Sequence, residues 1–146
     1  MRIRTRRAKA GLASAAVLLS GLGLGAATAS PAAAAGWCNQ STTYTANEGY
    51  WTGYVPTHNG ERDCTMSQGA SGRAVWALQR ALKYCYSQNI TVDSEFGPKT
   101  RDALEAAQRS AGVTADGIYG PNTAEALEFH FLNPGSTKSD CSKVPM

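Results

Sequence analysis

Two histidines and two aspartates are the residues of this chain whose types and spacing could support catalysis. A hydrolytic metal site needs about three His, Asp or Glu ligands and one open position. His58 and His130 are 72 positions apart, and neither lies in an H-E-x-x-H or H-x-H pattern. The sequence therefore predicts no metal site, and it gives no reason to expect a cofactor.

Asp93 and Asp116 are the candidates for a pair of catalytic carboxylates. Glycoside hydrolysis uses two such groups about 5–10 Å apart with different pKa values. These two aspartates hold the same position in a repeated motif, DSEFGPKT and DGIYGPNT, and matching surroundings do not separate two pKa values. The chain also lacks a G-x-S-x-G motif for a nucleophilic serine. We therefore expect a protein that is not an enzyme.

The repeated motif is the element that positions both aspartates. Residues 93–106 return as residues 116–129 at an offset of 23, with seven identical positions. A fixed offset indicates two copies of one supersecondary unit. In each copy a glycine is followed by a proline, which suits the first position of a helix. The sequence thus predicts a turn and then a helix, twice.

Three helices are expected to hold these turns. A first helix over about 72–86 would have Ser71 as its N-cap and an apolar face of Val75, Leu78, Leu82 and Cys85. The turns lead to a second helix over about 98–111 and a third over about 121–132, whose inner face would hold Ala126, Leu127, His130 and Phe131. The predicted fold class is mostly α, a compact three-helix bundle with an internal turn-helix repeat.

An aromatic-rich segment, residues 36–63, precedes the helices. It holds two of the three Trp and three of the six Tyr residues and has no helical period. Residues 43–45 and 50–52, on either side of Asn47-Glu48-Gly49, suggest a short β-hairpin. The rings either pack on the helices or face a ligand, and we favour packing because so short a segment has no core of its own. We expect this segment to cover Trp76 of the first helix.

The first 35 residues have the pattern of an export signal. Five Lys and Arg residues precede an apolar run over residues 12–29, and Ala33-Ala34-Ala35 fits a cleavage site. Glycines and a proline interrupt the apolar run, which disfavours a membrane-spanning helix. The general secretory and twin-arginine export routes both stay open. The chain is expected to be secreted and to lie outside the cell or on the cell wall.

The charge of the chain changes when this signal is removed. All 11 Asp and Glu residues but only nine of the 14 Lys and Arg residues lie after residue 35, which gives residues 36–146 a net charge of −2. A mildly acidic chain without a basic run lacks the electrostatic pattern of nucleic-acid binding. It also has no basic amphipathic helix for a membrane surface. Neither partner is expected, and we expect a monomer.

Four cysteines, Cys38, Cys64, Cys85 and Cys141, all lie after the expected signal. An even number in an exported chain indicates two disulfides, because small exported domains often need covalent cross-links to supplement a small core. The sequence permits three pairings, and the one we select is Cys38 with Cys64 and Cys85 with Cys141. Buried free thiols are the disfavoured alternative.

Three motifs together resemble a known family. The run G-x-x-V-x-x-L-Q-x-x-L begins at Gly72, and the motifs D-x-x-F-G-P-x-T and D-G-I-Y-G-P-N-T follow at residues 93–100 and 116–123. This arrangement resembles the peptidoglycan-binding domain of bacterial cell-wall hydrolases and exported proteins, over about residues 64–131. The resemblance implies a three-helix fold that binds cell-wall polymer without chemistry of its own. Two departures, Ser94 in place of the usual Gly and Ala107-Gln108 in place of an aromatic-Gln pair, weaken the first repeat more than the second.

The turn residues are the candidate ligand-binding positions that follow from this resemblance. Binding would be shallow and polar, through backbone groups at the Gly turns, Asp and Thr side chains and an aromatic ring. The second turn is the stronger candidate. Its residues are Asp116, Gly117, Tyr119, Gly120 and Thr123, and those of the first turn are Asp93, Phe96, Gly97 and Thr100. The alternative interpretation is structural, since Gly, Pro and Asp in turns usually serve the turn itself.

The predicted function is an exported, non-catalytic protein that binds peptidoglycan. Its organisation would be a signal peptide (1–35), the aromatic-rich segment (36–63), a helical peptidoglycan-binding-like domain (64–132) and a loop-like tail (133–146). One alternative is an exported protein-interaction module or inhibitor that grips its partner with residues 36–63. A less favoured alternative is a small cell-wall hydrolase.

Overall fold

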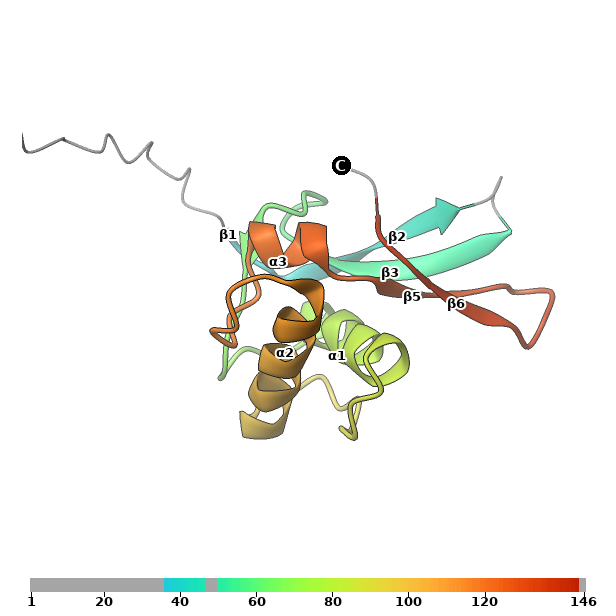
Figure 1. The fold of residues 1–146 in the computed structure, drawn as a ribbon. Helices are drawn as coiled ribbons and strands as arrows, with labels where there is room; N and C mark the ends of the chain where they lie inside the picture. The colour runs from blue at the N-terminus through green and yellow to red at the C-terminus, as the bar shows by residue number, and fades with distance from the viewer. Residues whose placement is uncertain (1–35, 47–49, 145–146) are drawn as a thin grey trace, which may run out of the picture. The chain divides into compact units, whose positions relative to one another are not determined.

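The computed structural model describes residues 36–46 and 50–144 (Figure 1). The expected export signal and the hairpin turn at 47–49 lie outside the described residues. The elements in chain order are β1 (Gly36–Trp37), β2 (Gln40–Ala46), β3 (Trp51–Thr57), β4 (Cys64–Thr65), α1 (Arg73–Cys85), α2 (Pro98–Ala111), α3 (Pro121–Ala126), β5 (Phe129–Leu132) and β6 (Ser139–Ser142). No helix in these ranges is both long enough and apolar enough to cross a membrane.

A four-stranded antiparallel sheet is the main departure from the predicted fold. Its strand order is β2-β3-β5-β6, and Figure 1 shows the two early strands beside the two late ones. Thr52 pairs with Leu132, and Gly53 with Phe131, where β3 meets β5. A second sheet pairs β1 with β4 in parallel. The prediction of a mostly α three-helix bundle is therefore wrong.

The third helix is much shorter than predicted. It ends at Ala126, and Leu127 already has extended backbone angles (φ −77°, ψ 147°). The backbone N–H of Glu128 donates to the Tyr86 hydroxyl at 2.8 Å instead of to a helical carbonyl. Residues 129–132, FHFL, then pair with β3 and β6 as β5. Over so few residues the apolar spacing fits a helix and a buried strand equally well, so the sheet decides the conformation.

The tail and the N-terminal hairpin also contain more strand than expected. The tail, predicted to be loop-like, contains β6, in which Cys141 pairs with His130. The hairpin is confirmed, and its strands extend beyond the expected residues 43–45 and 50–52 to seven residues each. Tyr54 of this hairpin contacts Trp76 edge-on, with 5.1 Å between ring centroids. The predicted cover of Trp76 is thus confirmed.

The first two helices lie close to the predicted positions, and α2 has the predicted ends. The N-cap of α1 is Gly72 rather than Ser71, and no side chain caps it. The inner face of α1 is confirmed at Val75, Leu78 and Leu82, each at most 1% exposed. These residues join the aromatic side chains of β5 and the apolar side of α2 in one core.

Two disulfides and a buried arginine fasten the ends of the described chain to this core. The disulfides join Cys38 to Cys64 and Cys85 to Cys141, as predicted. Arg62 is only 8% exposed. Its guanidinium donates hydrogen bonds to the Val144 carbonyl at 2.8 Å and to the Ala124 carbonyl at 2.6 Å.

Candidate functional site

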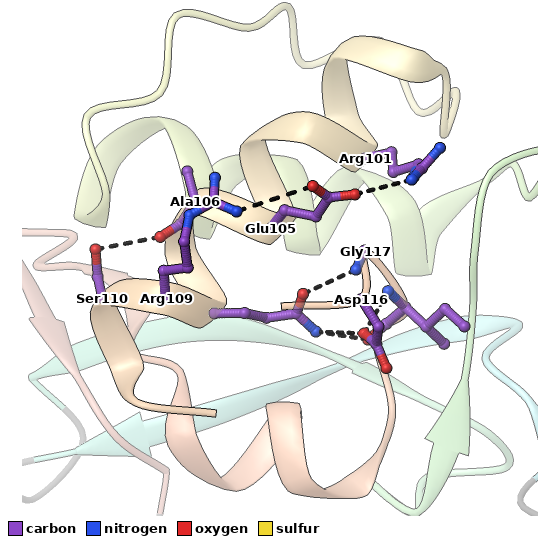
Figure 2. Close-up of polar contacts among 9 residues, drawn as sticks. Arg101, Glu105, Ala106, Arg109, Ser110, Asp116 and Gly117 are labelled. Atoms are coloured by element: carbon purple, nitrogen blue, oxygen red, sulfur yellow. Dashed lines mark hydrogen bonds and ion pairs between the residues drawn. The ribbon is translucent and has the colours of Figure 1, made fainter. Parts of the chain in front are cut away.

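The second turn is organised around one buried glutamine side chain. Gln108 of α2 is 0% exposed. Its amide nitrogen donates to Asp116 Oδ1 at 3.0 Å, to the Ile118 carbonyl at 2.9 Å and to Thr123 Oγ1 at 3.0 Å. Its amide oxygen accepts the Gly117 N–H at 3.0 Å. Figure 2 shows the turn at Asp116 and Gly117 beside α2.

The first turn has the same network around Gln79 of α1. The Gln79 amide nitrogen donates to Asp93 Oδ1 at 2.8 Å, to the Glu95 carbonyl at 3.0 Å and to Thr100 Oγ1 at 3.1 Å. In both turns the aspartate oxygen also accepts the backbone N–H two residues later, at 2.9 Å. The Gln79 amide is the main reason that the pKa of the Asp93 carboxyl lies below its ordinary value, with the Glu95 N–H adding to the effect.

The backbone of the two turns matches as well. Ser94 and Gly117 occupy equivalent positions, and each has a φ of 69°, in the left-handed region. A Cβ atom added at Gly117 would lie 2.7 Å from Arg101 Cγ. Ser94 therefore adopts the glycine conformation of the repeat in spite of its side chain.

We expect Ser94→Gly to stabilise the protein and Gly117→Ala to destabilise it. The first change relieves the strain of a left-handed backbone at residue 94. The flexibility of glycine in the unfolded chain offsets part of this effect, so the free energy of unfolding should rise by about 0.5 kcal/mol. The second adds both strain and the contact with Arg101, for a loss of about 1–2 kcal/mol. Urea unfolding of both variants measures the two free energies. A stabilising Gly117→Ala change would contradict the equivalence of the turns.

The aromatic residue of each turn is buried under it. Tyr119 is 0% exposed and Phe96 is 2% exposed. Tyr119 exchanges two backbone hydrogen bonds of 2.9 Å with Met66, and Phe96 donates its N–H to the Ala70 carbonyl at 2.9 Å. Burial raises the pKa of the Tyr119 hydroxyl. Each ring therefore supports its turn from below.

A groove of about 910 Å³ lies beside the second turn. The second repeat supplies most of its lining, the segment that follows α2 adds three residues, and β4 adds one threonine. The lining residues are Thr65, Gly112, Val113, Thr114, Asp116, Ile118, Gly120, Pro121, Asn122, Thr123, Glu125 and Ala126. The groove thus brings together hydroxyl, amide and carboxylate groups with a few apolar side chains.

The groove contains part of the predicted site. Among the second-turn candidates, Asp116, Gly120 and Thr123 line it, whereas Gly117 and Tyr119 are buried and do not. The first-turn candidates, Asp93, Phe96, Gly97 and Thr100, are not among its lining residues. The structure therefore separates the two turns.

An exposed isoleucine of this groove is not among the predicted site residues. Ile118 is 43% exposed and lines the groove. The equivalent residue of the first repeat is Glu95. This difference between the two copies was the signal that could have identified Ile118. One copy has an exposed charge at this position and the other an apolar residue, and surface positions seldom need an isoleucine for folding. Asn122 and Glu125 were also missed, and nothing in their local sequence marks them.

The side chains of the groove are rich in groups that form hydrogen bonds. It contains two carboxylates, Asp116 and Glu125, and no Lys or Arg. Among residues 36–46 and 50–144, no cluster of three His, Cys, Asp or Glu residues is placed to hold a metal ion. Threonine hydroxyls, an asparagine amide and carboxylates can bind sugar hydroxyl groups and peptide N–H groups.

The two histidines first considered as metal ligands lie in different settings. His58 Nδ1 is 2.8 Å from the Trp37 carbonyl. His130, 7% exposed, stacks on Tyr84 and has its Nδ1 2.9 Å from a guanidinium nitrogen of Arg80. Because that guanidinium can only donate, His130 Nδ1 is the acceptor, and the ring is neutral. Burial and the Arg80 charge lower the pKa of His130.

This lowered pKa predicts that the protein loses stability between about pH 7.5 and pH 5.5. Below its ordinary pKa of about 6.5, His130 binds a proton in the unfolded chain but not yet in the folded one, so a fall in pH favours unfolding. Urea unfolding at both pH values checks this. His130→Leu should reduce the pH dependence of the free energy of unfolding. An unchanged dependence in that variant would show that other groups cause it.

Comparison with known proteins gives a family match over the helical region. Residues 71–127 match the family model described as "Putative peptidoglycan binding domain". No curated protein matches the chain. The N-terminal domain of SleB is a similar solved structure, 38% identical, with 42% of this chain and 84% of that chain covered and a TM-score of 0.40.

Two further solved structures are similar over part of their length. A peptidoglycan-binding protein from Clostridioides difficile, in complex with glutamine hydroxamate, is 30% identical, with 57% of this chain and 53% of that chain covered and a TM-score of 0.44. An endolysin of Burkholderia phage AP3 is 35% identical, with 51% of this chain covered and a TM-score of 0.41. This chain covers 26% of the endolysin.

Proposed function

Because this chain belongs, through residues 71–127, to the peptidoglycan-binding domain family, we propose that it is an exported protein that binds peptidoglycan at the groove beside the second turn. The observation that carries the proposed site is the Gln108 network, which fixes Asp116 at the rim of this groove. A preorganised polar surface binds a sugar or peptide chain with little loss of side-chain freedom.

The second turn is favoured over the first by its side chains. Ile118 offers an exposed apolar contact, whereas the equivalent Glu95 offers a charge. An apolar side chain beside hydroxyl and amide groups suits the mixed surface of a glycan or of a short peptide. Tyr119 and Gly117 contribute from below, by holding the turn that presents Asp116 and Ile118.

Binding without catalysis is supported by the matching surroundings of the two aspartates. Asp93 and Asp116 each accept one glutamine amide and one backbone N–H. A general acid and a general base need environments that push their pKa values apart. The hydrogen-bond partners of Asp93 and Asp116 are of the same kinds, and each carboxylate is engaged in its own turn, so we assign neither of them a catalytic role.

Export is supported by the sequence of residues 1–35 and by the cross-links of the folded part. The first 35 residues combine a basic start, an apolar run and a small-residue cleavage site. The two disulfides persist in oxidising surroundings such as the outside of a cell. We place the working protein outside the cell or on its wall.

Sedimentation with purified insoluble peptidoglycan tests the proposed function. We expect the wild-type protein in the pellet at moderate salt. Ile118→Glu, which puts the residue of the first turn into the second, should weaken retention about tenfold, because a carboxylate replaces an apolar contact. Leu132→Glu is the matched control, since Leu132 is exposed to a similar degree (39% against 43%) but lies outside the groove.

The outcomes separate the alternatives. If the wild-type protein stays in the supernatant, the proposal fails and a protein-interaction role takes its place. If the two variants lose retention equally, the groove is not the binding surface. Release of soluble fragments from dye-labelled peptidoglycan over several hours would contradict binding without catalysis.

A further inference from the structure

The outer face of α1 has a concentration of positive charge. The helix contains Arg73, Arg80 and Lys83 and no acidic residue. In the described ranges, the only carboxylate paired with a cation at ion-pair distance is Glu105 on α2, whose partners are Arg101 and Arg109. The two arginines of α1 are therefore available to an external anion.

Aromatic rings hold these arginines in place. The Arg73 guanidinium carbon lies 4.4 Å from the ring centroid of Trp76, and that of Arg80 lies 4.9 Å from the same centroid. Arg80 also lies 5.6 Å from the ring centroid of Tyr84. Residues 73, 76, 80 and 84 follow one line along the helix, because their spacings of 3, 4 and 4 match its period. We call these four residues the Arg–aromatic stripe.

The sheet fixes the stripe from behind. Tyr54 of β3 packs edge-on against Trp76, and His130 of β5 stacks on Tyr84 with 4.5 Å between ring centroids. His130 also accepts a hydrogen bond from Arg80 at 2.9 Å. Tyr84 remains 51% exposed. The guanidinium groups are thus largely ordered before any partner binds, which lowers the entropy cost of binding.

The stripe differs from the peptidoglycan groove in place and in charge. None of its residues lines the groove, which carries Asp116 and Glu125. One surface is cationic and the other has only acidic charged groups, so the same group of a ligand would not suit both. A ligand of the stripe would therefore have to differ from the ligand of the groove.

We propose that the Arg–aromatic stripe binds an anionic cell-wall polymer, a linear chain of sugar or polyol units that carry phosphodiester or carboxylate groups. The two guanidinium carbons lie 4.4 and 4.9 Å from one ring centroid, so they are no more than about 9.3 Å apart, which suits neighbouring charged groups on one extended chain. Arg binds phosphate and carboxylate groups with two parallel hydrogen bonds. The exposed Tyr84 ring offers a face for the apolar side of a sugar unit.

Nucleic acid is a weaker candidate for this surface. Binding to nucleic acid rests on many phosphate contacts, whereas α1 offers three cations on a chain whose residues 36–146 carry a net charge of −2. A few ordered cations on an acidic protein suit a polymer that is already concentrated at the wall, where the groove holds the protein close to it.

The test measures binding of the purified protein to soluble polyanions at low and moderate salt. The probes are poly(glycerol phosphate), polygalacturonate, a single-stranded oligonucleotide and poly-glutamate. We expect binding to one or both of the first two, and the preferred one identifies phosphodiester or carboxylate as the recognised group. Tighter binding to the oligonucleotide or to poly-glutamate would overturn the proposal.

Matched variants assign the binding to the stripe. The double variant Arg73→Gln with Arg80→Gln should bind the preferred polyanion about tenfold more weakly. Lys138→Gln with Lys143→Gln removes the same charge from exposed positions outside α1 and should change the affinity by less than about twofold. Equal losses in the two double variants would overturn the stripe as the site.

Two controls keep this result separate from the fold and from the groove. The melting temperature of each variant shows whether it folds, and Arg73→Lys with Arg80→Lys keeps the charge while removing the planar guanidinium groups. We expect intermediate binding from this lysine variant, and wild-type affinity would show that charge alone suffices and overturn the role of the stacked guanidinium groups. Sedimentation with peptidoglycan stripped of attached polymers by hydrogen fluoride should be unaffected by the Arg73→Gln and Arg80→Gln changes.

Discussion

Replacing Gln108 by alanine should destabilise the protein by about 3–5 kcal/mol, because the change leaves a cavity and several buried polar groups without their partner. The side chain is fully buried and bonds to Asp116, Gly117, Ile118 and Thr123. Each buried group left unsatisfied costs roughly 1–3 kcal/mol. Urea unfolding followed by far-ultraviolet circular dichroism measures the loss. A cost below about 1 kcal/mol would show that the turn holds without the glutamine.

Gln79→Ala is the matched control for this prediction. It removes the same network from the first turn and should lower the free energy of unfolding by a similar amount. The two variants should differ in binding, since only the second turn lines the groove. Measured at a temperature where both variants are folded, retention on peptidoglycan should fall for Gln108→Ala and persist for Gln79→Ala. Equal retention would remove the second turn from the site.

The second large effect concerns the disulfide between Cys85 and Cys141. It closes a loop with a sequence separation of 56, against 26 for Cys38 and Cys64. In the chain-entropy model, removal of the longer cross-link costs about 4 kcal/mol and removal of the shorter one about 3.5 kcal/mol. We expect a further loss for the longer one, because it joins the end of α1 to the edge strand β6.

Denaturant unfolding of the two double alanine variants checks this order. Cys85→Ala with Cys141→Ala should unfold at the lower urea concentration and should lose hydrogen-exchange protection first along β6. Cys38→Ala with Cys64→Ala should leave β6 protected. The opposite order of midpoints would show that strain in the folded state outweighs loop length.

The sequence was sufficient to locate the first two helices but not the sheet. Gly97-Pro98 begins α2 as predicted, because local turn chemistry sets that start. The triplet Ala-Leu-Glu occurs twice, and it lies within α2 at residues 103–105 but crosses the end of α3 at 126–128. The same residues are thus helical in one copy and partly extended in the other. Pairing of β5 with β3 makes the difference, and such distant partners are not visible in a local pattern.

The candidate site was also predictable only in part, because some of its contacts are not visible in a local sequence pattern. The aspartates and threonines of the turns were found through the repeat, whereas the glutamines that hold them were not assigned this role. Gln79 and Gln108 are 29 residues apart, while the turns repeat at 23, so a search at one fixed offset does not align them. The link between each glutamine and its turn becomes visible only when the turn is considered together with the helix that precedes it.

The pairing of β3 with β5 has a consequence for the order in which this protein can fold. Thr52 and Leu132 are 80 residues apart in the chain, and the whole family module lies between them. Such distant pairing forms late, after more local contacts. A growing chain emerging from the ribosome therefore cannot close the sheet until residue 132 is made. Until then α1 can pack against β2 and β3 of the early hairpin, but its contacts with β5 and β6 are missing, so its cover by the sheet stays incomplete.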